Sequence, residues 1–285
     1  MGAPGITRDG RVIIQAVTPQ VEGGRYAAKA VVGDDVVVAA DIFREGHDKL
    51  AAVIRYRGPT DRSWRESPLE LDVNDRWYGA FHVDAMGAWR YTVCAWTDHY
   101  ASWLDGLRKK HEAGQEDLEL ELADGRALLE RRRFPRAALP VVERALERLS
   151  GGASNEERVA AAADPERAEV LRAHPERLDA STLRPDLPLW VDRERARFSA
   201  WYEMFPRSEG AVVPTDEDPS ATEARSGTFA DAQKRLPAIA EMGFDVVYLP
   251  PIHPIGRTNR KGRRGPHDLQ PGPDDPGVPW AIGSE

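Results

Sequence analysis

The sequence predicts a multidomain α and β protein in three parts: an antiparallel β-sandwich, a helical bundle and the start of a parallel β-α-β arrangement. Three observations carry this prediction. Residues 10–98 contain short β-rich runs in which apolar and polar side chains alternate, as they do in half-buried strands. Residues 101–180 are rich in Ala, Leu, Glu and Arg, with apolar residues at helical spacing. After Arg195, a helical pattern separates two short apolar runs, which is typical of a crossover between parallel strands.

The first part, residues 1–100, is predicted to be an immunoglobulin-like β-sandwich. In one run, Trp89, Tyr91 and Val93 alternate with polar residues, so one face of the strand is expected to be buried. Turn residues separate this run from its neighbours. The runs expected to form strands are residues 12–17, 35–43, 50–57, 77–83 and 89–96.

The second part, residues 101–182, is predicted to be a helical insertion domain of three to five helices. Helices commonly begin where a side chain can accept a hydrogen bond from a free backbone N–H, and Pro is tolerated at their first position. The starts that carry such a signal, including one in the third part, are Ser154 with Glu157, Asp164 with Pro165, and Thr228 with Asp231.

A linker and an incomplete β-α-β unit are predicted for the remaining chain. Residues 183–194 contain two prolines and are expected to connect the domains. Within residues 195–285 we expect a strand at 198–204, a helix at 228–242 and a parallel strand at 246–249. Two parallel strands and one helix cannot bury their own apolar faces, so this β-α-β unit is predicted to be incomplete.

Composition narrows the class of protein. The formal net charge of −8 argues against general nucleic-acid binding, because nucleic-acid-binding domains usually carry basic faces. The single cysteine, Cys94, lies in a strand-like run and is expected to be a structural thiol. No signal peptide or membrane span is recognisable, which predicts a cytoplasmic protein. The histidines show no metal-ligand spacing, so neither a metal nor another cofactor is expected.

A dense group of cations follows the predicted strand at 246–249. The loop is stiffened by prolines, and it would lie at the carboxyl end of a parallel strand, where α/β proteins bind their ligands. Because the chain as a whole is acidic, this local excess of positive charge predicts an anionic small molecule as ligand. The cations are Arg257, Arg260, Lys261, Arg263 and Arg264.

Six segments, spread in order along almost the whole chain, are similar to one known family. They are Asp75-Arg-Trp-Tyr-Gly-Ala-Phe81, Ala95-Trp-Thr-Asp98, Trp201-Tyr-Glu-Met-Phe-Pro-Arg-Ser208, Pro250-Pro-Ile-His-Pro-Ile-Gly256, Asn259-Arg-Lys-Gly-Arg263 and Ala281-Ile-Gly-Ser284. With these segments the chain resembles the bacterial maltosyltransferases of the α-amylase superfamily. It departs from them at Arg264-Gly265, where the family usually has two asparagines.

The resemblance implies a reaction and its parts. Members of the family transfer maltose from α-maltose 1-phosphate to the non-reducing end of α-1,4-glucans and release phosphate, by a retaining double displacement that uses two carboxylates. The resemblance also implies that residues 195–285 are the start of a (β/α)8 catalytic barrel, which needs roughly 250 residues and which this sequence truncates. The two carboxylates lie on later barrel strands, so no catalytic residue is assigned here and the fragment is expected to be inactive alone. Lys261 matches the lysine that helps to bind the donor. The family also implies a homodimer held by its N-terminal parts.

Two alternatives stay open from the sequence. One is another α-amylase-type enzyme of glycogen metabolism, such as a branching or debranching enzyme, which would release no phosphate. The other is a non-catalytic module that serves dimerisation or glucan binding.

Several residues that invite a functional interpretation have a simpler one. Glu203 and Asp245 are expected to be capping or salt-bridging carboxylates rather than catalytic groups. His253 is expected to be a packed or hydrogen-bonded structural imidazole, although it could face a pocket. Core packing is the expected role of most of the tryptophans in the sandwich, Trp64, Trp77, Trp89 and Trp96, rather than stacking on sugars.

Overall fold

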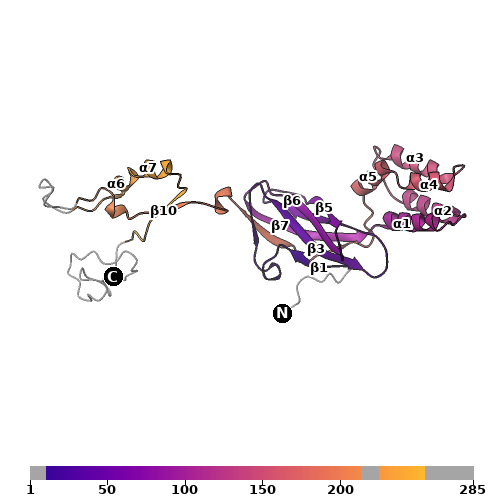
Figure 1. Cartoon of the computed structure of the whole chain (residues 1–285), viewed down its shortest axis with the longest axis horizontal. Helices are drawn as coiled ribbons and strands as arrows, with labels where there is room; N and C mark the ends of the chain where they lie inside the picture. The colour runs from indigo at the N-terminus through magenta and orange to yellow at the C-terminus, as the bar shows by residue number, and fades with distance from the viewer. Residues whose placement is uncertain (1–10, 213–224, 254–285) are drawn as a thin grey trace. The chain divides into compact units, whose positions relative to one another are not determined.

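The computed structural model describes residues 11–212 and 225–253. The chain divides into two compact units, residues 1–194 and residues 195–285, and each is treated by itself (Figure 1). Within the described ranges, none of the helices has the length and apolar character that crossing a membrane would require.

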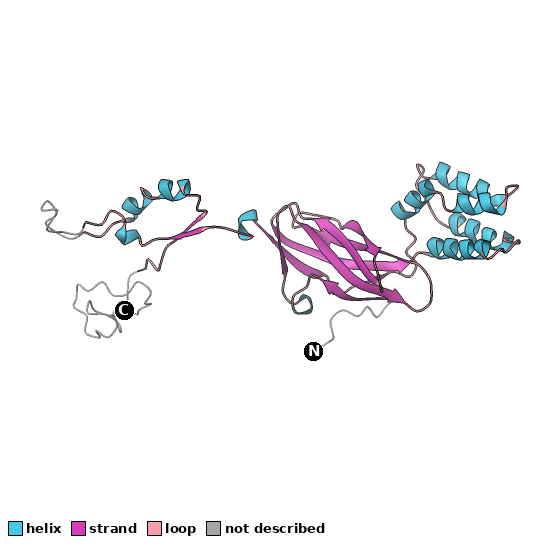
Figure 2. Cartoon of the chain, in the orientation of Figure 1, coloured by secondary structure: helices cyan, strands magenta, loops and turns pink. Residues whose placement is uncertain are grey.

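The first unit is built on one curled nine-stranded sheet (Figure 2). Its strand order is β1-β3-β6-β5-β4-β7-β9-β2, and β8 pairs with β7. Neighbouring strands are antiparallel except β2 and β9, which are parallel. The strands are β1 (Val12–Thr18), β2 (Ala28–Val31), β3 (Asp35–Arg44), β4 (Leu50–Arg57), β5 (Arg65–Leu71), β6 (Arg76–His82), β7 (Gly87–Thr97), β8 (Ser181–Thr182) and β9 (Leu187–Asp192).

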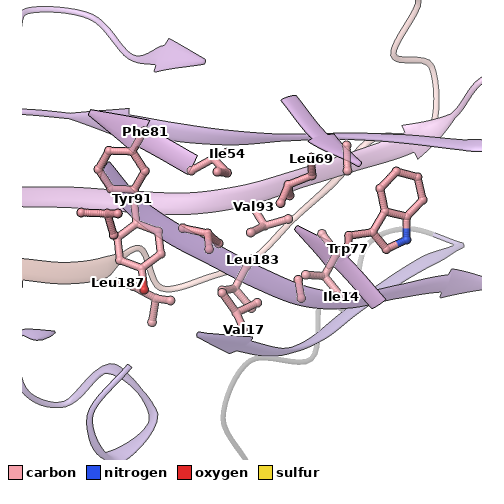
Figure 3. Close-up of a cluster of buried hydrophobic side chains, with 14 of the residues drawn as sticks. Ile14, Val17, Ile54, Leu69, Trp77, Phe81, Tyr91, Val93, Leu183 and Leu187 are labelled. Carbon is pink, nitrogen blue, oxygen red and sulfur yellow. The ribbon is translucent and has the colours of Figure 1, made fainter. Parts of the chain in front are cut away.

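The core of the sheet lies between strands that are not neighbours in the strand order. The Phe81 ring on β6 stacks on Tyr56 of β4, with centroids 4.5 Å apart, and also contacts Tyr91 of β7 at 5.7 Å. The sheet therefore folds over so that side chains from β1, β3 and β6 meet those from β4, β7 and β9 (Figure 3). Polar atoms in this core are paired, since the Trp77 indole N–H donates to the Ile42 carbonyl at 3.1 Å.

Five helices are inserted between β7 and β8. They are α1 (His99–Glu112), α2 (Glu119–Glu130), α3 (Leu139–Ser150), α4 (Asn155–Ala162) and α5 (Pro165–Ala173). They enclose a second core that includes Tyr100, Leu107, Leu122 and Leu149, all 5% exposed or less. The predicted capping box at Ser154 and the Asp164 N-cap before Pro165 are both confirmed.

A polar clasp joins the two ends of this insertion. Asp179, just before β8, accepts a hydrogen bond from the Thr97 backbone N–H at 3.0 Å and another from the Thr97 hydroxyl. Arg44 of β3 donates to the same hydroxyl and lies 3.5 Å from the Asp179 carboxylate. Thr97 is fully buried, so these bonds satisfy groups that would otherwise be costly inside the protein.

The strands expected at 12–17, 35–43, 50–57, 77–83 and 89–96 correspond to β1, β3, β4, β6 and β7. The linker expected at 183–194 needs correction, because it contains β9, which pairs with both β7 and β2. Pro188 is one of the two prolines that favour a linker here. It lies opposite Arg90 on β7 but before the pairing with β2 begins, so the strand tolerates its missing N–H.

In the second unit two short parallel strands, β10 (Trp201–Glu203) and β11 (Val246–Tyr248), pair in register. The expected buried strand at 198–204 is shorter and more exposed than predicted. The expected helix at 228–242 consists of two, α6 (Phe229–Gln233) and α7 (Leu236–Glu241), because Pro237 starts a new helix. Short 3-10 turns occur at Glu22–Gly24, Glu194–Ala196 and Pro206–Ser208.

Candidate functional site

A half-open pocket of about 290 Å³ lies where β10 and β11 end. Its walls come from the loop after β10, the loop after β11 and the start of α6. The carboxyl ends of parallel strands are the ligand-binding end of α/β folds, so this pocket is the candidate site of the second unit. The lining residues are Phe205, Pro206, Arg207, Gly227, Thr228, Phe229, Pro250, Pro251, Ile252 and His253.

Close backbone packing fixes two walls of the pocket against each other. The Gly227 N–H donates to the Arg207 carbonyl at 2.8 Å. A Cβ at position 227 would overlap the Glu209 carbonyl, so only glycine allows this approach. Val212 and Arg225 also exchange two backbone hydrogen bonds of 2.9 Å.

Asp231 is the polar centre of this wall. Its carboxylate accepts hydrogen bonds from the Thr228 N–H at 3.1 Å and the Thr228 hydroxyl at 2.8 Å, which completes the predicted capping box. It also pairs with Lys234 at 3.0 Å and Arg225 at 3.2 Å. Together these contacts, with the bond from Lys234 the strongest, hold the pKa of Asp231 far below its usual range. The start of α6 is therefore held in place by a carboxylate that stays charged at neutral pH.

The chemistry that the pocket offers is cationic and apolar. Arg207 is exposed, and among the described residues no carboxylate lies within ion-pair distance of it. The Thr228 hydroxyl is already used by Asp231 and is not free to bind a ligand. An anionic group at Arg207, with an apolar or ring-shaped body against Phe205 and Phe229, is what this lining suits best.

The two faces of the β10–β11 pair differ. Tyr202, Met204 and Val247 pack toward α6 and α7. Residues of the opposite parity, Trp201 and Tyr248, are 59% and 39% exposed and lie with ring centroids 6.3 Å apart. In a barrel, the face away from the helices is the inward one.

The two carboxylates of this region sit as follows. Asp245 accepts a hydrogen bond from the Ala200 N–H at 3.0 Å and pairs with Arg195, as expected for a structural carboxylate. Glu203 ends β10 on the exposed face, in register with Tyr248.

His253 corrects one expectation. It is exposed in the pocket wall rather than packed as a structural imidazole. Sequence reasoning missed Arg207 as a site residue, although its place just after the first parallel strand was a usable signal. The proposed donor-binding residue Lys261 and the cations Arg257, Arg260, Arg263 and Arg264 lie outside the described residues.

Other candidates in the first unit take structural roles. Cys94 and Trp96 on β7, Trp77 and Trp89 are each 6% exposed or less. Trp64 is half-buried beneath the guanidinium groups of Arg55 and Arg57. Over the described ranges, no group of three or more His, Cys, Asp or Glu side chains is placed to hold a metal ion.

Comparison with known proteins gives a consistent result. The profile of a family described as alpha-1,4-glucan:maltose-1-phosphate maltosyltransferase, domain N/S, matches residues 10–193. The chain is 44% identical to the maltosyltransferase of that name from Myxococcus xanthus, over 97% of this chain and 41% of the relative. Identity is 45% to maltosyltransferase 1 of Streptomyces coelicolor, over 96% of this chain and 40% of the relative. It is 41% to the Mycobacterium tuberculosis protein, over 97% and 42%. The chain thus spans about two fifths of the length of these curated relatives.

Proposed function

The chain belongs to the alpha-1,4-glucan:maltose-1-phosphate maltosyltransferase family, and we propose that it supplies the N-terminal part of an enzyme that transfers maltose from α-maltose 1-phosphate to the non-reducing end of α-1,4-glucans, with release of phosphate. The observation that carries this proposal is the 40–45% identity to enzymes of that name, which runs through almost the whole chain. The pocket supports it, because its cationic and apolar lining suits a sugar phosphate.

The mechanism that goes with this proposal is a retaining double displacement. A carboxylate attacks the sugar, phosphate leaves, and the glucan 4-OH then displaces the carboxylate. Within this sequence no residue is assigned to either carboxylate role, so the 285 residues alone should not turn over. Lys261 is proposed to contact the donor, because an ammonium group is a compact charge that binds phosphate or sugar oxygens. No cofactor is required by this chemistry.

The fold proposed for the first unit is an immunoglobulin-like sandwich. In that fold, strands A, B, E and D form one sheet and strands C, F and G the other. The observed order supports this reading, since β1-β3-β6-β5 matches A-B-E-D and β4-β7-β9 matches C-F-G. The helical domain then lies in the connection between F and G.

For the second unit, we take β10, the two short helices and β11 to be the opening β-α-β portion of a (β/α)8 barrel. Parallel pairing of the two strands supports this assignment, as does the packing of α6 and α7 on one face only. A cytoplasmic homodimer remains our proposal for the assembled protein.

A chimeric enzyme tests the proposed function. This chain would replace the matching 41% of the Myxococcus xanthus relative, and phosphate release from α-maltose 1-phosphate would be measured with a glucan acceptor. We expect turnover by the chimera and none by the 285-residue chain. A folded chimera without phosphate release would refute the proposal.

Lys261 is tested in the same chimera. K261A should raise the KM for the donor by roughly tenfold, since a charge-assisted contact is lost. K109A, on the exposed surface of α1, removes the same charge elsewhere and should leave the KM unchanged. An unaltered donor KM in K261A would remove this residue from the site.

The alternative is a non-catalytic dimerisation or glucan-binding module. The resemblance of its N-terminal parts to those of homodimers favours it, and light scattering of the 285-residue chain tests it. A dimer that binds glucan while the chimera fails to release phosphate would favour this reading over the enzyme.

A further inference from the structure

Two arginines face each other on the outer side of the sheet. Arg57 of β4 and Arg90 of β7 are directly opposite in the antiparallel register. Their neighbours Tyr56, Trp89 and Tyr91 point into the core, so the two arginines point outward. Like charges at directly opposed positions destabilise a sheet unless something compensates for them.

No carboxylate compensates for this pair. Among residues 11–212 and 225–253, neither Arg57 nor Arg90 lies in a salt bridge. The Arg90 guanidinium makes only a long contact of 3.5 Å with the Asp186 carbonyl. Two residues earlier on β4, the charge of Arg55 is compensated. Glu66 lies opposite Arg55 and forms salt bridges with both Arg55 and Arg177.

Aromatic rings lie on either side of the arginine pair. The Arg57 guanidinium is held over the Trp64 ring, 4.7 Å from its centroid, which orients its N–H groups. On the other side Trp190 of β9 is 46% exposed and pairs with the small Ala88 of β7, so its ring is not covered by that neighbour. Lys29 of the edge strand β2 lies opposite Trp190 and adds a third cation without a salt bridge in the described part of the chain.

We propose that Arg57 and Arg90 form an oxyanion-binding site whose ligand is a phosphorylated saccharide, with Trp190 stacking on the sugar ring. Guanidinium groups carried on two opposed positions are donors from which phosphate oxygens accept hydrogen bonds, and a bound phosphate would draw both side chains toward it from their contacts with Trp64 and Asp186. An exposed indole supplies the flat apolar surface on which a pyranose ring rests. This site belongs to the first unit and is separate from the pocket of the second.

Binding of glucose 1-phosphate to the 285-residue chain tests the proposal. The readout is the indole N–H signal of Trp190 in a two-dimensional NMR spectrum, and inorganic phosphate and maltose serve as the two half-ligands. The experiment is run in a chain that carries R207Q and K261A, so that the pocket does not contribute. We expect saturable binding that weakens with salt, and weaker binding of either half-ligand.

Variants assign the binding to this surface. R57Q/R90Q should lower the affinity by roughly tenfold or more, because both oxyanion donors are lost. W190A should lower it by a smaller factor, with binding followed by calorimetry. The control R133Q/R136Q removes two exposed charges from the helical domain and should leave the affinity for glucose 1-phosphate unchanged.

Three results would overturn the proposal. The first is equal affinity in R57Q/R90Q and the control. The second is inorganic phosphate binding as tightly as glucose 1-phosphate with no effect of W190A, which would mean an adventitious ion only. The third is binding by the wild-type chain that R207Q/K261A abolishes but that R57Q/R90Q, introduced into the wild-type chain, retains. That result would reject this site and leave the proposed pocket function standing.

Discussion

The two compact units differ in how many of their large apolar side chains they bury. In residues 1–194, Ile14, Ile54 and Tyr91 are completely buried within one continuous core. In the described part of residues 195–285, Phe198 is 81% exposed and Trp201 59% exposed. The comparison teaches that regular secondary structure does not by itself give a chain segment an extensive core, since the buried cluster in the described part of the second unit is small.

The reason lies in how many faces of each sheet are covered. The nine-stranded sheet folds over and covers its own inner face. The pair β10–β11 has one face covered by α6 and α7, and a two-stranded sheet cannot cover the other. Trp201 and Tyr248, which lie on that other face, are correspondingly exposed among the described residues.

The largest expected effect comes from the same substitution made in both units. W89A should destabilise the first unit by about 3–5 kcal/mol, because Trp89 is 1% exposed and its indole also donates to the Ala85 carbonyl. W201A should change the free energy of unfolding by less than about 0.5 kcal/mol. Urea unfolding of the 285-residue chain, followed by circular dichroism, measures both. Equal losses of unfolding free energy in W89A and W201A would contradict the difference described between the two units.

A smaller effect is expected at the clasp of the insertion. D179N removes charge-assisted hydrogen bonds to Thr97 and should cost about 1.5–3 kcal/mol. Burial alone raises the pKa of Asp179, but the hydrogen bonds from Thr97 outweigh it, so the pKa is lowered.

That pKa direction fixes how stability depends on pH. A carboxylate whose pKa is lowered on folding stabilises the protein above its unfolded pKa, near 4, and the contribution disappears as the pH falls through the folded value. The loss of stability in acid should therefore be shallower in D179N than in the wild type. D48N, at a more exposed partner of Arg44, is the control, and an identical acid limb in D179N and wild type would contradict the assignment.

Two glycines within helices test packing directly, because one has a side chain packed against it and the other has free space around it. At Gly125 in α2 a Cβ would overlap the Trp103 ring, so G125A should destabilise the helical domain by about 1–3 kcal/mol. At Gly106 in α1 nothing lies near, so G106A should stabilise it by about 0.5–1 kcal/mol, since Ala favours helix. Thermal unfolding gives both values, and shifts of the same sign would count against the packing described for α2.

The smallest effect is local and lies in the second unit. D231N removes the charge of the carboxylate that binds Thr228, Arg225 and Lys234, and so weakens its hydrogen bonds and salt bridges. Exchange of the Gly227 amide hydrogen should become faster, while the unfolding transition of the first unit stays where it was. Because the pKa of Asp231 is held so low, the wild-type amide should stay protected well below pH 4 and lose protection only in stronger acid. Unchanged exchange in D231N would show that the pocket wall does not depend on this carboxylate.

Alternation predicted the long strands because part of each has one buried and one exposed face, as Trp89 and Arg90 show on β7, although the later residues of that strand, 91–97, are buried on both faces. It did not predict β2, β5 or β9. The short edge strand β2 is too brief to show a period, and prolines interrupt β5 and β9 at Pro68 and Pro188. Helix caps were readable because the capping bonds join residues three apart, as at Thr228 and Asp231.

The candidate site was predictable only in part. The end of a parallel strand pointed to a loop that lines the pocket, but the place of His253 in the pocket wall depends on how the loops after β10 and β11 pack together. Arg207 faces the same pocket although it is distant in sequence, and no local pattern links them. The arginine pair on the sheet was hidden for a similar reason, since it depends on the register of two strands 33 positions apart, at Arg57 and Arg90.

The place where the helical domain is inserted has a consequence for how long the inserted segment can be. The chain leaves the sheet after β7 and returns on β8, whose residues Ser181 and Thr182 pair with Ala95 and Cys94. The end of β7 and the start of β8 are thus neighbours in one antiparallel strand pair. A short turn would also be long enough to connect them. The hydrogen bonds of the sheet therefore set no length for the segment that joins β7 to β8, and the helical domain is attached to the sheet at one strand end.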